Sequence, residues 1–272
     1  MKMLIVAVDS HQYQATLRFG SEVAKALSAD TTLLGVLKKV QKGKGLQRAV
    51  DDAAQELADL GLTARVRIDV NQPQQIVVTE LERDTYDLVA VGAPDSQQIS
   101  HALLGLVSSI ERAASFVLVV KGDRPNLSRV LICSSGTEYS RLPVQTGADV
   151  ASGAGAQVTL LHVLDPMPIM YTGLERMEQT MAEFLQTDTE QAKEVKWALR
   201  TVQAQCELVE LELRRGIVGD EILRESEVGD YDLIVLGSSR SGAGLARVLL
   251  GDVTGGLIIH AQRPVLAVRS RS

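Results

Sequence analysis

The chain has 272 residues, of which 45% are hydrophobic and only 3% are aromatic, and its formal net charge is −6. This acidic balance disfavours nucleic acid and anionic membrane surfaces as partners, because both select clustered Lys and Arg. No apolar run approaches the roughly 20 residues of a membrane span, and the first residues lack a signal-peptide pattern. The two cysteines, Cys133 and Cys206, are typical of buried thiols in a reducing compartment. We therefore expect a cytoplasmic protein.

The first half alternates short Val-rich runs with helical segments, which is typical of a parallel sheet covered on both faces. Between the first two strands, Phe19, Val23 and Leu27 form an apolar stripe at the 3.6-residue helical period. Gly and Pro then punctuate residues 121–126, which predicts a linker. Strands are predicted near 3–9, 31–37, 64–69, 87–92 and 116–120, and further helices over 47–60, 74–84 and 102–114.

The second half repeats this order, with extra length at 174–205. Apolar residues there follow a near-heptad stripe that fails at Asp188 and Gln191, while Thr187 and Glu190 have the spacing of a capping box. The segment is therefore predicted as one helix or as two helices with a break, and its stripe is expected to pack on its own sheet in preference to a partner's helix. Strands are predicted near 129–134, 157–163, 207–214, 232–237 and 264–268.

The two halves are copies of one unit. The run Asp87–Gly92 (DLVAVG) corresponds to Asp232–Gly237 (DLIVLG). We therefore predict an α/β fold of two tandem doubly wound domains, residues 1–122 and 127–272, each with a five-stranded parallel sheet and helices on both faces. Because the fifth strands are too apolar to remain as open edges, we expect them to pair with each other and join the halves.

The candidate binding residues lie in the loops after strands one and four. In an open parallel sheet, ligands bind beyond the carboxyl ends of the strands, where the strand order reverses. The strand-four loop carries Gly92 and Gly105 in the first copy, and Gly237, Gly242 and Gly251 in the second. Small residues let the backbone approach a phosphate, and free amides at a helix start bind it. A tight strand-to-helix turn also needs glycines, so these residues alone leave both interpretations open.

In both copies this loop resembles that of the universal stress protein family, and the resemblance covers nearly the whole chain as a tandem member. The family pattern is Gly, two residues, Gly, nine residues, then Gly followed by Ser or Thr. Members that hold this pattern bind ATP, with an Asp at the end of strand one beside the adenine. The resemblance further implies the strand order 3-2-1-4-5 in each half and antiparallel pairing of the two fifth strands.

The first copy departs from this pattern in two places. Asp9 matches the Asp at the end of strand one, and Gly92 and Gly105 match the outer glycines. Asp95, however, stands at the second glycine position, and Leu106 replaces the Ser or Thr. A carboxylate repels a triphosphate, and Leu has no hydroxyl to donate. The first copy is therefore predicted to bind ATP poorly.

The second copy departs from the pattern differently. Gly237 and Gly251 match the outer glycines but lie one residue further apart than the pattern requires, and Gly242 is one place away from the middle glycine. Asp252 replaces the Ser or Thr, and Ser135 stands where the strand-one Asp belongs. A carboxylate at this point is equally able to cap its own helix. ATP binding is therefore kept as the alternative, with the second copy favoured.

Two further residues complete the set of candidate cofactor-binding positions. Gly216, which follows strand three of the second copy, fits the family pattern, and Ser238 follows Gly237 at the start of the glycine-rich loop. Asp9 and the five strand-four glycines named above make up the rest. ATP is the only cofactor that this set suggests, and no metal site is predicted.

Catalytic motifs are missing from the sequence. Neither first strand is followed by Gly-x-Gly-x-x-Gly, so a nicotinamide or flavin enzyme is disfavoured. There is no phosphate-binding Gly-x4-Gly-Lys-Ser/Thr motif and no Gly-x-Ser-x-Gly elbow. The four histidines are scattered and lack the spacing of metal ligands, and His162 alternates within a strand, which predicts a buried core residue.

The sequence therefore predicts a non-catalytic protein of stress response or regulation, which acts by binding a small ligand or a protein partner. The competing hypothesis is an adenine-nucleotide sensor that binds ATP and hydrolyses it slowly. The tandem halves are expected to form an intramolecular pseudo-dimer. Whether that unit forms a homodimer, and which partner it binds, is left open by the sequence.

Overall fold

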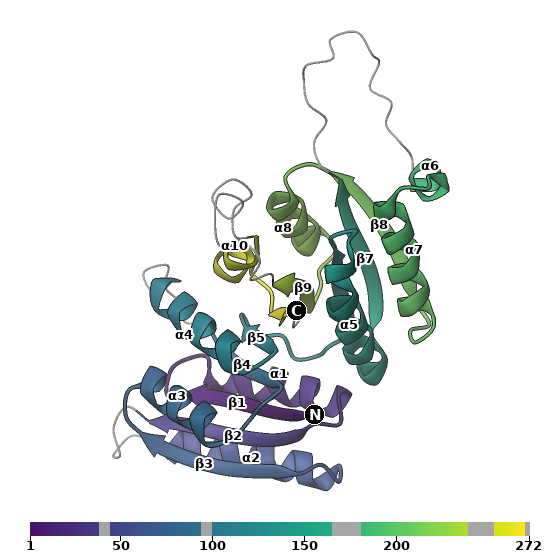
Figure 1. The fold of residues 1–272 in the computed structure, drawn as a ribbon. Coiled ribbons are helices and arrows are strands. Elements are labelled where there is room, and N and C mark those ends of the chain that lie inside the picture. Colours follow the sequence, from purple (N-terminus) through teal and green to yellow (C-terminus); the bar gives the residue numbers. More distant parts are fainter. Residues whose placement is uncertain (38–43, 94–99, 165–180, 239–252, 270–272) are drawn as a thin grey trace.

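The computed structural model describes residues 1–37, 44–93, 100–164, 181–238 and 253–269, drawn as coloured ribbon in Figure 1. These residues form two α/β halves that share one ten-stranded sheet. Among the described helices, none has the length and apolar character needed to cross a membrane. The predicted fold class is confirmed.

Each half contributes five parallel strands to the sheet. In the first half they are β1 (Lys2–Val8), β2 (Asp30–Leu37), β3 (Ala64–Val70), β4 (Leu88–Gly92) and β5 (Phe116–Val120). In the second half they are β6 (Arg129–Ser134), β7 (Gln157–Leu164), β8 (Val209–Arg215), β9 (Leu233–Ser238) and β10 (Val265–Arg269). The order across the sheet is β3-β2-β1-β4-β5-β10-β9-β6-β7-β8, so each half has the expected order 3-2-1-4-5.

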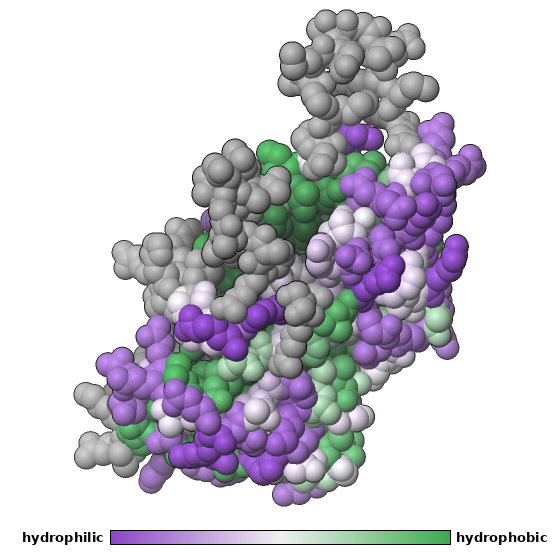
Figure 2. Space-filling model, viewed as in Figure 1, coloured by the Kyte–Doolittle hydropathy of each residue, from purple (hydrophilic) through white to green (hydrophobic). Residues whose placement is uncertain are grey.

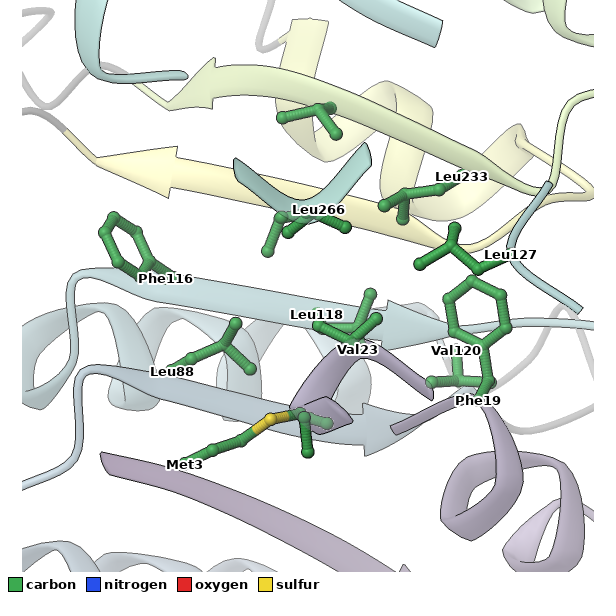
Figure 3. Packing of buried hydrophobic residues seen from close by; sticks show 14 of the residues in the cluster. Met3, Phe19, Val23, Leu88, Phe116, Leu118, Val120, Leu127, Leu233 and Leu266 are labelled. Atoms are coloured by element: carbon green, nitrogen blue, oxygen red, sulfur yellow. The ribbon is translucent and has the colours of Figure 1, made fainter. Parts of the chain in front are cut away.

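The two halves meet where β5 pairs antiparallel with β10. Leu118 on β5 lies opposite Leu266 on β10, and Phe116 lies opposite Val268. Figure 3 shows Leu118 and Leu266 side by side in a continuous apolar layer. The expected pairing of the fifth strands is thus confirmed. The exact domain boundaries, 1–122 and 127–272, stay a prediction, because the buried layers on both faces of the sheet run through both halves.

Helices cover both faces of the sheet (Figure 1). On one face, α1 and α2 of the first half continue into α5 and α7 of the second, and on the other face α3 and α4 continue into α8 and α10. The first half has α1 (Tyr13–Ala26), α2 (Lys44–Asp59), α3 (Pro73–Arg83) and α4 (Ser100–Ala113). The second half has α5 (Arg141–Ala154), α6 (Met181–Gln186), α7 (Glu190–Gln203), α8 (Val218–Val228) and α10 (Val253–His260).

Alternation along the strands divides the core between the two faces. Met3 and Ile5 of β1 point to the face covered by α1, where they pack with Phe19, while Leu4 and Val6 point to the face covered by α3. This two-residue period is the one expected of a strand buried on both sides. It explains why the strands read as continuous apolar runs in the sequence.

The extra segment of the second half contains two helices in its described part, α6 and α7. The Thr189 hydroxyl accepts a hydrogen bond from the Ala192 backbone amide at 3.2 Å, so Thr189, and not the predicted Thr187, caps α7. Ala192, Val195 and other buried residues of α7 pack against the second-half sheet, as expected. The opposite side of α7 is largely hydrophilic in Figure 2. Residues 174–180 lie outside the described part.

Candidate functional site

The crevice predicted for the first half would lie at the carboxyl ends of β1 and β4, which are neighbours in the sheet. Asp9 follows β1 directly, and its backbone amide donates a hydrogen bond to the Val36 carbonyl at 2.9 Å. Gly92 ends β4 beside helix α1. A Cβ atom at Gly92 would lie 2.3 Å from the Thr16 hydroxyl oxygen, so this glycine is required by packing even without a ligand. Asp9 and Gly92 therefore stand at the predicted end of the sheet.

Gly105 occupies a different setting from the other glycine of its loop. It is exposed and lies within α4, which begins at Ser100. Only the first four N–H groups of a helix lack intrahelical partners, so the amides of Gly105 and Leu106 fall beyond that group. The predicted middle position of the motif, Asp95, lies outside the described residues. In the first half, the glycine that the family pattern places at the phosphates is therefore part of a continuous helix.

Gly105 instead borders an open hollow of about 790 Å³ between α3 and α4. The described residues that line the hollow include neither Asp9 nor Gly92. Its polar lining is mostly amide and hydroxyl, with one carboxylate and no cation among the described residues. The lining residues are Asp69, Asn71, Gln74, Gln75, Ile76, Val78, Thr79, Gly105, Leu106 and Ser109.

The second-half crevice lies at the equivalent ends of β6 and β9, which are also neighbours. Gly237 is exposed, and its carbonyl accepts a hydrogen bond from the Thr254 hydroxyl of α10 at 3.2 Å. The next residue, Ser238, has a buried hydroxyl oxygen without a hydrogen-bond partner in the described part of the chain. Gly242 and Gly251, the other predicted members of this loop, lie outside the described residues.

Helix α10 begins at Val253, directly after Gly251 and Asp252 in the sequence. Because Gly251 and Asp252 lie outside the described residues, the position of the family pattern on the second-half scaffold stays a prediction.

The turn after β6 is built around His162 of β7. Gly136 adopts a left-handed backbone with φ of +67°, and a Cβ atom there would lie 2.7 Å from the His162 ring. His162 is buried, its Nδ1 lies 2.9 Å from the Ser134 carbonyl oxygen, and its ring stacks on Phe184 with centroids 5.5 Å apart. The prediction that His162 is a core residue is confirmed. Ser135, in place of the strand-one Asp, pairs its hydroxyl with that of Thr137 at 2.8 Å.

Gly216 directly follows β8 and contacts both β7 and α8. Its amide donates to the Leu164 carbonyl at 3.1 Å, and a Cβ atom would lie 2.9 Å from a carboxylate oxygen of Glu221 on α8. A larger residue at Gly216 would therefore have to displace the flexible Glu221 side chain. The role of Gly216 in binding stays a prediction, as do those of the other candidate residues.

Sequence reasoning missed a buried ionic cluster that occurs once in each half. In the first half, the buried carboxylate of Glu80 accepts hydrogen bonds from Arg67 at 2.6 and 2.8 Å and from the Tyr86 hydroxyl at 2.6 Å. Burial, together with the Glu80 hydrogen bond, raises the pKa of Tyr86 to about 12. The cluster ties α3 to β3 and to the segment that enters β4.

The second half carries the same cluster. Glu225 contacts Arg214 and accepts a hydrogen bond from the Tyr231 hydroxyl at 2.8 Å. Burial is the main cause that raises the pKa of Tyr231 to about 12. A buried carboxylate with all its partners in place is costly to disturb. Its sequence signal was visible in both copies, as a Glu six residues before the Tyr that precedes strand four.

Metal ligands do not converge in the described part of the chain, where no group of three or more His, Cys, Asp or Glu side chains is arranged to hold an ion. Both thiols, Cys133 and Cys206, are buried and free. Burial raises the pKa of Cys133 to about 12. Such a thiol stays protonated at neutral pH and is a poor nucleophile.

Comparison with known proteins agrees with the fold. A sequence model of the universal stress protein family matches residues 126–269. A universal stress protein of Mycolicibacterium smegmatis is 26% identical, with 98% of this chain and 97% of that protein covered. One of Methanocaldococcus jannaschii is also 26% identical and covers 56% of this chain and 87% of its own. The crystal structure of a universal stress protein from Archaeoglobus fulgidus matches with a TM-score of 0.62 and 16% identity, covering 98% and 96% of the two chains.

Proposed function

Because the chain belongs to the universal stress protein family, we propose that it is a non-catalytic stress-response protein that acts by binding a small ligand or a protein partner. In this proposal the first half does not hold ATP in the manner of the family motif. The family assignment supports the stress-related role. A cytoplasmic location remains a prediction of the sequence.

One observation carries the proposal for the first half. Helix α4 already includes Gly105 and Leu106, so their amides are not the free donors that a phosphate needs at a helix start. Leu106 also lacks the hydroxyl of the family pattern. The neighbouring hollow offers amide and hydroxyl side chains with the single carboxylate of Asp69, which is a poor setting for a triphosphate.

Equilibrium titration of the full chain with ATP and Mg²⁺ tests the proposal. We expect no saturable binding in the micromolar range. Asp9→Asn removes the first-half carboxylate that the family pattern places beside adenine, and is expected to leave the titration unchanged. Micromolar binding that Asp9→Asn abolishes would contradict the proposal, because it would place ATP in the first half.

A second candidate function is an ATP sensor whose site is in the second half. Two features favour it: the Thr254 hydroxyl of α10 bonds the Gly237 carbonyl at the end of β9, and the buried Ser238 hydroxyl has no described partner next to Gly237. The carboxylate of Asp252 at the position of a hydroxyl stands against it.

Native mass spectrometry of the purified chain separates the two candidates, since a nucleotide carried through purification adds its own mass. A bound adenine nucleotide that is lost in Gly251→Val but retained in Asp9→Asn would establish the sensor. A chain that carries no nucleotide, and binds none up to millimolar ATP, favours the ligand- or partner-binding role.

A further inference from the structure

A partly buried lysine from the first half reaches the end of a helix in the second half. Lys121 follows β5 directly, and its Nζ donates hydrogen bonds to the carbonyl oxygens of Ile259 and Ala261, each at 2.8 Å. These carbonyls lie at the C-terminal end of α10. The contact therefore crosses the joint between β5 and β10.

An arginine makes the reciprocal contact. Arg269 is the last residue of β10, and its Nη1 donates a hydrogen bond to the Glu111 carbonyl oxygen near the C-terminal end of α4. Lys121 and Arg269 stand at equivalent places in the two copies, at the end of each fifth strand. Glu111 and Ile259 stand near the ends of the two fourth helices. Figure 1 shows α4 and α10 on the same side of the sheet at the joint, and the two helices are in contact.

Each cation stabilises the C-terminal end of the helix that it contacts. The last four carbonyls of a helix lack intrahelical partners, and a positive charge is favourable at that end. Lys121 supplies such a charge and two donors to the C-terminal end of α10. Loss of water around Lys121 lowers the pKa of its ammonium group to about 8, so the contact is made in a partly dry environment.

The N-terminal end of α10 lies beside the carboxyl end of β9. The Thr254 hydroxyl, in the first turn of α10, bonds the Gly237 carbonyl at the mouth of the second-half crevice. A helix fixed at its C-terminal end by the other half therefore carries a crevice residue at its N-terminal end.

We infer that Lys121 and Arg269 are crossed positioning residues, through which each half orders the fourth helix of the other half, and that Lys121 thereby couples the turn at Gly237 to the β5–β10 joint. This inference goes beyond the proposed function, because it holds whichever ligand either crevice accepts. Separation of the joint would release both helices at once. A change in the first half at Lys121 therefore alters the order of α10 and of the turn at Gly237 in the second half.

Hydrogen–deuterium exchange of the full chain tests this coupling. Lys121→Met is expected to raise amide exchange in 253–260 on the order of tenfold while exchange in 100–113 stays within about twofold, since one hydrogen-bonded cation is lost at one helix. Arg269→Met is expected to do the reverse. Lys25→Met is the matched control, because Lys25 pairs with Glu22 of its own helix at the surface, and neither segment should change.

The crossed pattern distinguishes positioning from general stabilisation. An equal rise in both segments, a rise only in the substituted half, or no rise in either would each overturn the inference. If Lys121→Met does not fold, Lys121→Arg and Lys121→Gln replace it. The arginine variant keeps a charged donor and should retain protection of 253–260, whereas the glutamine variant should lose it. Equal exchange in these two variants would also overturn the inference. The readout needs no ligand, so a failed ATP titration leaves it intact.

Discussion

The two halves differ at the glycine at the end of the fourth strand, although Gly92 and Gly237 stand at the same place in the scaffold. A Cβ atom at Gly92 would lie 2.3 Å from the Thr16 hydroxyl oxygen of α1, whereas at Gly237 the nearest atom would be the Pro143 Cγ of α5 at 3.1 Å. The sheet order, the buried Glu–Arg–Tyr cluster and the crossed cations are the same in both halves. Repeated scaffolds can thus be kept intact while the space at one strand-to-helix turn differs between the copies.

The largest expected effect comes from breaking the scaffold that the halves share. Leu266→Lys places a charge opposite Leu118 in the buried joint, and we expect it to lower the free energy of unfolding by about 3–5 kcal/mol, because the ammonium group has no partner there. Chemical denaturation measures the loss, and sedimentation velocity shows whether the halves separate. Val66→Lys, on the partly exposed strand β3, is the control and should change stability little. An equally small effect of both would refute the buried joint.

A pair of glycine substitutions compares the two crevices directly. Gly92→Ala forces a methyl group to within 2.3 Å of the Thr16 hydroxyl oxygen, and should cost about 2 kcal/mol of unfolding free energy. In Gly237→Ala, the nearest atom is the Pro143 Cγ at 3.1 Å, so the expected cost is below about 1 kcal/mol. Thermal unfolding of both variants gives the difference. A larger loss in Gly237→Ala would reverse the ranking of the two turns.

Gly105→Ala is expected to stabilise the chain, in contrast to Gly92→Ala. A Cβ atom at Gly105 meets nothing within 4 Å, and the residue lies inside a helix. Because Ala is the better helix former, we expect a stabilisation of about 0.5–1 kcal/mol, measured by denaturant titration. If Gly105 had to approach a ligand or adopt a loop conformation, the same change would destabilise the chain.

A further effect is a pH dependence that Lys121 contributes. Its pKa is about 8 in the folded chain and 10.5 in the unfolded chain, so between these values the unfolded state binds more protons. The unfolding free energy of the native chain should therefore rise from pH 8 to 10.5 relative to Lys121→Met. Denaturation at several pH values measures this difference. A difference that stays flat or falls over this range would show that Lys121 is not desolvated.

Local patterns in the sequence were sufficient to predict most of the strands and helices. Every predicted strand is present within a few residues, because apolar runs bounded by turns record burial on both faces. The helix predicted over 102–114 already contained Gly105, and its observed start at Ser100 moves that glycine further inside. The apolar fifth strands predicted that β5 and β10 pair, but the strand order and the antiparallel direction of that pairing needed the family resemblance, since a pattern along one strand does not name its neighbour.

The contacts that sequence reasoning missed are the long-range polar ones. Glu80 and Tyr86 are close in sequence, but Arg67 joins them only through the fold. Lys121 was assigned to a linker, and nothing near it in the sequence points to Ile259. The cap of α7 moved from Thr187 to Thr189 because both residues can cap, and packing of Phe184 and Ala192 selects between them.

The antiparallel joint between β5 and β10 also bears on how two unlike copies can evolve together. Only residues 121–128 connect β5 to the first strand of the second half, so each copy meets the other at a very high effective concentration. Pairing within one chain therefore outcompetes pairing of like copies from different chains. Because the joint forms between two different copies in one chain, neither copy has to pair with an identical copy. The residues of one half can therefore change while those of the other half stay the same.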